Sequence, residues 1–132
     1  MDRLASRLDL ARRTRARLAE LSARETVSEV ERDAAIQRFE FSFEAAWHAA
    51  RLFLLEREGI EVASPKAAIR SSLQVGLLTE DDARLALVMA DDRNRTVHTY
   101  DEALAAQIFA QLDGYTRLLT RWIDALDRNA PP

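Results

Sequence analysis

The stretch AIQRFEFSFEAAWHAARLFL, residues 35–54, decides the fold because it is long, lacks Gly and Pro, and has the apolar spacing of an α-helix. One set of apolar side chains recurs every three or four residues, as on one face of a helix. A second set falls nearly opposite at about 100° per residue. The first set is Ile36, Phe39, Phe43, Trp47, Ala50 and Leu54, and the second is Phe41, Ala45, His48, Leu52 and Leu55.

Two apolar faces on one helix have two explanations. A helix in a small bundle needs only one wide apolar face. The second face is therefore covered either by another helix of the same chain or by a second subunit. An apolar stripe left open on a monomer would be a liability, so the pattern favours a homodimer while leaving the intrachain explanation open.

Helix signals flank this stretch on both sides. We expect helices over about residues 2–23 and 31–57, the latter ended by Gly59, with the polar residues 24–29 as a turn. Ser64 and Pro65 predict the start of a short helix that Gly76 can end. Thr79 is the expected N-cap of the next helix, in which Leu85, Val88 and Met89 point inward.

A last helix is predicted by the capping-box pattern of Thr99 and Glu102, and it continues nearly to the C-terminus. The tail from about residue 128 to 132 should be frayed. The prediction is an all-α protein, an up-and-down four-helix bundle with one additional short helix. The 132 residues are expected to form a single domain over 1–132.

Composition narrows the function classes. The chain has no Cys, so thiolate metal sites and disulfides are excluded. Its formal net charge of −3 gives no general attraction to nucleic acid. Neither a membrane span nor a signal peptide is visible, so we expect a soluble, cytoplasmic protein. The two histidines, His48 and His98, show no repeated spacing with carboxylates, and no metal or other cofactor is expected.

The stretch DDRNRTVHTY, residues 91–100, concentrates the chemistry of the chain. The inward stripe of the preceding helix, continued, reaches Asp92 and Thr96, and a buried polar group must find a partner or face a cavity. Arg93 should end that helix, His98 should lie at the junction, and Tyr100 should lie in the first turn of the next helix. The amides of that first turn can also attract an anion.

An Arg and a His at one corner suit a phosphodiester. Arg binds phosphate through two hydrogen bonds and can stabilise a developing phosphorane. His transfers protons near neutral pH, and the 2′-hydroxyl of RNA supplies an internal nucleophile without a metal. A structural explanation stays open, because Arg, Asn and His also suit the negative end of a helix, and Asp91 and Asp92 could pair with Arg95.

Three sequence blocks point to a known family. Arg93-x-x-x-x-His98-x-Tyr100 resembles the motif of the HEPN superfamily, specifically its HepT-type toxins. DDRNRTVHTYDE, with AIQRFEFSFEAAWHAARLFL and SPKAAIRSSLQVGLL upstream, is similar to the bacterial nucleotidyltransferase substrate-binding protein family. The resemblance spans about Ala34 to Ile108. It implies a helical-bundle homodimer that is encoded beside a small nucleotidyltransferase.

The resemblance implies roles for the motif residues. In the HepT branch the Arg and His form a metal-independent ribonuclease site in a dimer cleft, and the partner inactivates it by adenylylating the Tyr. Arg93 would then stabilise the transition state, His98 would transfer protons, and Tyr100 would be modified. In the substrate-binding branch the same cleft need not catalyse a reaction. Supporting residues would be Asp92, Asn94, Thr96 and Asp101.

The leading hypothesis is therefore a substrate-binding-type partner of a separate nucleotidyltransferase, in a two-component, toxin–antitoxin-like pair. The alternatives are a ribonuclease toxin of the HepT type and a non-catalytic dimeric scaffold. The ligand would be RNA or a nucleotide, with no membrane partner. Lacking a Walker-type glycine loop and a Gly-Ser motif, the chain is not expected to be a nucleotidyltransferase itself. One strip of the long central helix carries charged side chains, namely Glu40, Glu44 and Arg51, with His48 beside them. We interpret this strip as solvated ion pairs, and the alternative is that these side chains line the cleft.

Overall fold

A computed structural model describes residues 2–130, which form helices and connecting turns and no β-strand. The long helices are α1 (Arg3–Ser22), α2 (Glu29–Glu58), α4 (Glu80–Arg95) and α5 (Glu102–Asn129). The short helix α3 (Pro65–Gln74) and a 3₁₀ turn, η1 (Thr96–His98), complete the order. The predicted all-α class, with four long helices and one short one, is confirmed. Residues 131 and 132 of the expected frayed tail lie outside the described residues.

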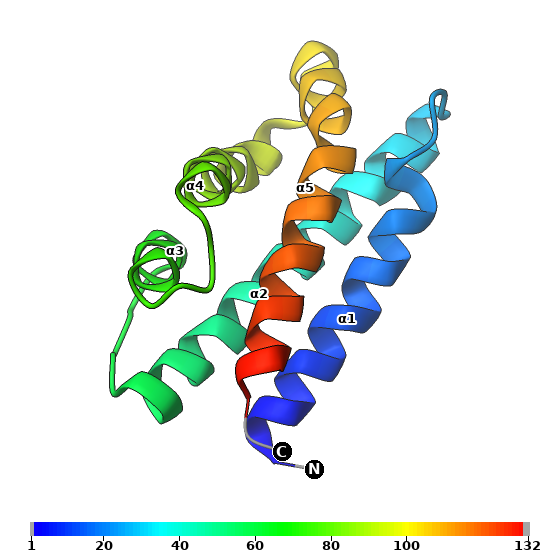
Figure 1. Cartoon of the computed structure of the whole chain (residues 1–132). Helices are drawn as coiled ribbons and strands as arrows, with labels where there is room; N and C mark the ends of the chain where they lie inside the picture. Colours follow the sequence, from blue (N-terminus) through cyan, green and yellow to red (C-terminus); the bar gives the residue numbers. More distant parts are fainter. Residues whose placement is uncertain (1, 131–132) are drawn as a thin grey trace.

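The helices surround α2. Figure 1 shows α1, α2 and α5 side by side, while α3 and α4 lie on one flank and are seen nearly along their axes. α2 packs against α1, α3, α4 and α5. The chain ascends in α1, descends in α2 and descends again in α5 (Figure 1). The strongly tilted α4 therefore returns the chain to the end of the bundle where α5 begins.

The helix boundaries follow local capping chemistry. Ser28 caps α2 with a full capping box, in which Ser28 Oγ accepts from the Glu31 amide and the Glu31 carboxylate accepts from the Ser28 amide. The prediction missed this cap and began the helix about two residues late. Gly59 ends α2 at φ 66°, a left-handed conformation that favours glycine, as predicted. Ser64 and Thr79 cap α3 and α4, also as predicted.

The start of α5 differs from the prediction. The N-cap is Asp101, whose carboxylate accepts from the amides of Ala103 and Leu104, and not Thr99. The Thr99 hydroxyl instead donates to the Thr96 carbonyl at 2.9 Å. The reason is the 3₁₀ turn after α4, which delays the helix, and the charge of Asp101, which suits a helix N-terminus. Tyr100 therefore precedes α5 and does not lie in its first turn.

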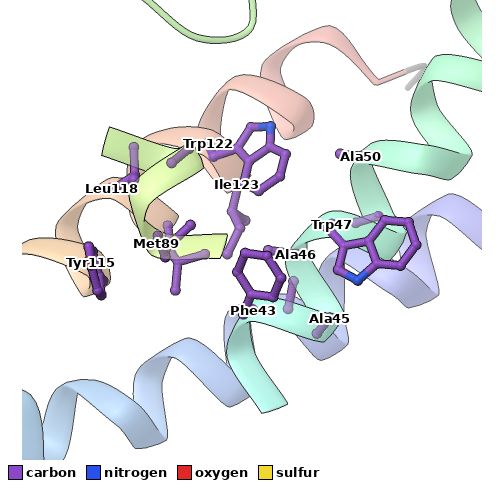
Figure 2. Packing of buried hydrophobic residues seen from close by; sticks show 14 of the residues in the cluster. Phe43, Ala45, Ala46, Trp47, Ala50, Met89, Tyr115, Leu118, Trp122 and Ile123 are labelled. Atoms are coloured by element: carbon purple, nitrogen blue, oxygen red, sulfur yellow. The ribbon is translucent and has the colours of Figure 1, made fainter. Parts of the chain in front are cut away.

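The core is built from the first apolar face of α2 and the inner face of α5. Figure 2 shows Phe43 of α2 facing Ile123 of α5, with Met89 of α4 nearby, and all three side chains are buried. The inward prediction was right for Met89 and wrong for Val88, which is 51% exposed because it falls on the outer side of α4. The largest buried side chains include Trp122, Tyr115, Phe39, Phe43, Leu18 and Leu54.

The second apolar face of α2 is covered only in part within the described residues. Ala45 and Leu52 are buried, whereas Phe41 is 56% exposed and Leu55 is 44% exposed. α1 runs beside both ends of this face, because residues of α1 line one hollow with Phe41 and another with Leu52 and Leu55. Packing within the chain thus explains part of the two-faced pattern, and Phe41 and Leu55 remain exposed. The homodimer stays a prediction.

Across residues 2–130, no helix combines the length and the apolar character that crossing a bilayer would need.

Candidate functional site

Asp92 anchors the corner between α4 and α5. Its side chain is buried at 3% residue exposure, and Tyr115 of α5 donates its hydroxyl to Asp92 Oδ2 at 2.5 Å. Arg95 forms an ion pair with the other carboxylate oxygen. Burial, together with the hydrogen bond to Asp92, raises the pKa of Tyr115. The buried polar group predicted at this position has found partners, and these hold the end of α4 against α5.

Two other supporting residues have structural tasks. Thr96 is buried, and its hydroxyl donates to the Arg93 carbonyl at 2.7 Å, which closes the last turn of α4. The Asp101 carboxylate accepts hydrogen bonds from the backbone amides of Ala103 and Leu104, in the first turn of α5. Two of those amides are therefore already hydrogen-bonded to a carboxylate of the chain itself, and an external anion would have to compete with Asp101 for them. Asn94 lies exposed on α4.

Arg93 pairs with a residue of α2 that the sequence did not connect to it. Its guanidinium lies 3.5 Å from Glu44 Oε1, and its Nε is buried without a hydrogen-bond partner among the described residues. Glu44 Oε2 also accepts from Trp47 Nε1 at 3.1 Å and lies 3.4 Å from His48 Nε2. Glu44 therefore connects α2, on which it lies, to Arg93 of α4. The Glu44 side chain is 41% exposed and forms ion pairs, as the interpretation of a solvated ion-pair strip expected, and the contact with Arg93 also brings it to this corner. Its i, i+3 and i+4 spacing to Trp47 and His48 was the visible signal for its partners on α2.

His98 and Tyr100 stand on the open side of the corner. Both are exposed, Tyr100 by 83%, and their ring centroids lie 6.0 Å apart in an edge-on arrangement. Across residues 2–130, Arg93 makes no ion pair with any acid except Glu44, and it makes no hydrogen bond with His98. The structure thus brings His98 and Tyr100 together, while Arg93 faces α2 behind them.

The arrangement defines what the corner can do. The exposed imidazole of His98 and the exposed phenol of Tyr100 offer donors to an anionic group that approaches from solvent, while Arg93 Nε is buried behind them. The described residues show no hydrogen bond between Arg93 and His98, and a ligand that binds the Arg93 guanidinium would share it with Glu44. In the part of the chain that the structure describes, no group of three or more His, Cys, Asp or Glu side chains is placed to hold a metal.

The fold described above, a small helical bundle, is shared with proteins of known structure. HI0074 from Haemophilus influenzae, described as revealing the fold of a substrate binding domain of a nucleotidyltransferase, superposes with a TM-score of 0.67. It is 23% identical, and the match covers 94% of this chain and 96% of HI0074. At that identity the likeness concerns the fold alone.

Residues 6–128 match the family described as nucleotidyltransferase substrate binding protein like, and the chain belongs to this family. A protein of known crystal structure from Thermus thermophilus is 53% identical, with a TM-score of 0.86. That match covers 88% of this chain and 98% of the Thermus protein. No curated protein gives a significant match.

Proposed function

We propose that this protein is the substrate-binding-type partner of a separate nucleotidyltransferase, in a two-component, toxin–antitoxin-like pair. The observation that carries the proposal is the family match, which extends over residues 6–128 and so covers nearly all of the four long helices. The sequence contains no glycine-rich nucleotide-transfer motif, so we assign the transfer chemistry to the other protein.

The α4–α5 corner is the face that we assign to this partnership. Val97 and Tyr100 are strongly exposed apolar or aromatic side chains, at 69% and 83%, and they flank the exposed His98. Aromatic side chains dominate binding energy at protein interfaces when they enter a pocket on the partner. Beneath them Asp92 and Tyr115 keep the end of α4 rigid, which lowers the entropic cost of binding.

The test is calorimetric titration of this protein with the small nucleotidyltransferase that the proposal expects to be encoded beside it. We expect a saturable complex, and Tyr100→Ala should weaken it by about tenfold or more, as for an interface hot spot. Leu73→Ala, which truncates a partly exposed apolar side chain on α3, is the matched control and should leave affinity unchanged. Failure of the two wild-type proteins to bind at micromolar concentrations would remove the proposal.

A second candidate function is metal-independent RNA cleavage, which the complete Arg93, His98 and Tyr100 set favours. The exposed His98 imidazole can take the proton of a 2′-hydroxyl as its oxygen attacks phosphorus and return a proton to the 5′-oxygen as the P–O5′ bond breaks, and Arg93 would stabilise the phosphorane between these steps. Purified protein should then cleave RNA but not DNA in the presence of EDTA. Arg93→Ala and His98→Ala should each reduce the rate about 10²–10³-fold, and the double variant should be far from additive.

The Glu44 ion pair offers a sharper test of that second candidate. If Arg93 acts on the phosphorane, Glu44 competes with the RNA for the same guanidinium. Glu44→Gln removes the competing charge and should leave cleavage intact or faster. Activity that depends on a divalent metal, or that persists in His98→Ala, would eliminate this mechanism. The protein would then be a binding partner without catalysis at this corner.

A further inference from the structure

The Glu44 carboxylate lies between two basic side chains from different helices. Its Oε1 atom is 3.5 Å from the Arg93 guanidinium of α4, and its Oε2 atom is 3.4 Å from His48 Nε2, one turn further along α2. His48 carries a charge only when it is protonated, whereas Arg93 is always charged. The two basic groups therefore compete for one negative charge, and the strength of that competition depends on pH.

The contacts of Glu44 leave its carboxylate free to turn. Charge-assisted hydrogen bonds have lengths of about 2.7–2.9 Å, and both distances from Glu44 are longer. The Arg121–Asp82 pair shows the contrast, since its two hydrogen bonds are each 2.9 Å long. The Glu44 side chain is 41% exposed, and it accepts a hydrogen bond from Trp47 Nε1 at 3.1 Å. A carboxylate held at this one point can rotate toward either basic group.

The surroundings of His48 make Glu44 important to its protonated form. The imidazole stacks on Trp47, with ring centroids 4.1 Å apart. α1 places Arg3 and Arg7 around the same hollow as His48, and α2 adds Arg51. Burial lowers the pKa of His48 and the charges of Arg7 and Arg51 lower it further, while Glu44 acts in the opposite direction. A proton on His48 therefore strengthens the attraction of the imidazole for Glu44.

We propose that Glu44 is a movable counter-ion shared by His48 and Arg93. When His48 takes up a proton, the imidazolium draws the carboxylate toward itself, and the Arg93 guanidinium becomes more available to an anionic ligand. Within residues 2–130 Arg93 pairs with no acid other than Glu44, and its Nε is buried without a hydrogen-bond partner. The coupling is a property of the chain itself, and it holds whichever function the α4–α5 corner has.

The movement of the carboxylate is the part of this proposal that an experiment can isolate. Charges at fixed positions act additively, so a rigid Glu44 would leave the influence of Arg93 on His48 the same whether Glu44 is charged or not. A carboxylate that turns between the two basic groups makes their effects non-additive, as a double-mutant cycle measures. The coupling is also reciprocal, because any change at Arg93 that releases Glu44 must favour the protonated form of His48.

The experiment is an NMR titration of the His48 imidazole in the full chain, with His98→Gln used to identify the second histidine. Arg93→Gln should raise the pKa of His48, because Glu44 is then left to the imidazole alone. In the Glu44→Gln protein the same replacement should raise it far less. Arg51→Gln is the matched control, since this arginine acts on His48 directly and should raise its pKa equally with and without Glu44.

The Arg93 Nε–H group provides a second readout in the wild-type protein. This group is buried, so its proton should exchange slowly enough to be observed, and the signal is identified by its loss in Arg93→Gln. Its chemical shift should change with the same midpoint as His48, and the change should disappear in His48→Gln. Circular dichroism should show that the variants are folded.

Two results would overturn the shared counter-ion. One is an equal effect of Arg93→Gln on His48 with and without Glu44, because this would show that the carboxylate is fixed. The other is an Arg93 Nε–H signal that does not follow the titration of His48, or that follows it unchanged in His48→Gln. If Arg93→Gln does not fold, the comparison of this signal between wild type and His48→Gln decides the question alone.

Discussion

Replacing Tyr115 by Phe tests whether the Asp92 anchor holds the α4–α5 corner together. The substitution keeps the buried ring and removes only the hydroxyl that donates to Asp92 at 2.5 Å. Asp92 is 3% exposed, so water cannot readily replace this donor, and Arg95 is left as its ion-pair partner. A hydrogen bond to a charged group contributes about 1.5–3 kcal/mol, and the free energy of unfolding should fall by about that amount.

The assay is urea unfolding at pH 7.5, followed by circular dichroism. For a chain of this size, the expected loss corresponds to a melting temperature lower by roughly 5–12 °C. Asp91→Asn is the matched control, because it neutralises the neighbouring exposed carboxylate, which pairs with Lys66. Exposed ion pairs contribute little, so the control should change stability by less than about 0.5–1 kcal/mol. A Tyr115→Phe protein as stable as the wild type would refute the anchoring role.

The dependence of stability on alkaline pH gives an independent test of the hydrogen bond between Tyr115 and Asp92. The folded state raises the pKa of Tyr115 above its ordinary value of 10.0. Above pH 10 the unfolded chain loses this proton while the folded chain keeps it, so stability must fall as pH rises. The stability contribution is fully present below pH 10, and Tyr115→Phe should remove this part of the alkaline loss. An identical alkaline slope in both proteins would contradict the assignment.

Three further predictions concern assembly, modification and acid stability. Light scattering at micromolar concentration should give about twice the 15.0 kDa chain mass, and a monomeric mass at all concentrations would exclude the homodimer. Incubation with the partner nucleotidyltransferase and ATP should add AMP to the peptide that contains Tyr100, which is 83% exposed; modification that persists in Tyr100→Phe would refute this. Burial lowers the pKa of His48 below 6.5, so the unfolded chain binds the extra proton first. Stability should therefore decline as pH falls through 6.5 and below, and His48→Gln should reduce that decline.

Much of the fold was predictable because its signals are local. The apolar period of residues 35–54 predicted the central helix, and Gly59, Ser64 and Thr79 marked boundaries that the structure confirms. Each signal acts over one or two helical turns and can be read without knowing the neighbours. The misplaced start of α5 shows the limit, since Thr99 and Asp101 are both acceptable caps and the 3₁₀ turn decided between them.

The sequence by itself indicated which residues of the corner are candidates for chemistry. The motif named Arg93, His98 and Tyr100, and the helical stripe indicated that Asp92 and Thr96 would be buried. Residue type and local period are sufficient for both inferences. The open environment of His98 and Tyr100 also follows from their place in a short junction, which has few neighbours to cover it.

Only the tertiary structure decided the partners of those residues. Asp92 meets Tyr115, 23 residues away, and Arg93 meets Glu44 on α2. A surface hollow between α1 and α2 likewise forms only where Arg7 of α1 and Arg51 of α2 face one space. No local period relates such positions, because the relative rotation and tilt of two packed helices depend on all the side chains between them. The sequence thus determined the set of charged groups, and helix packing decided which charges are neutralised and which remain open to a ligand.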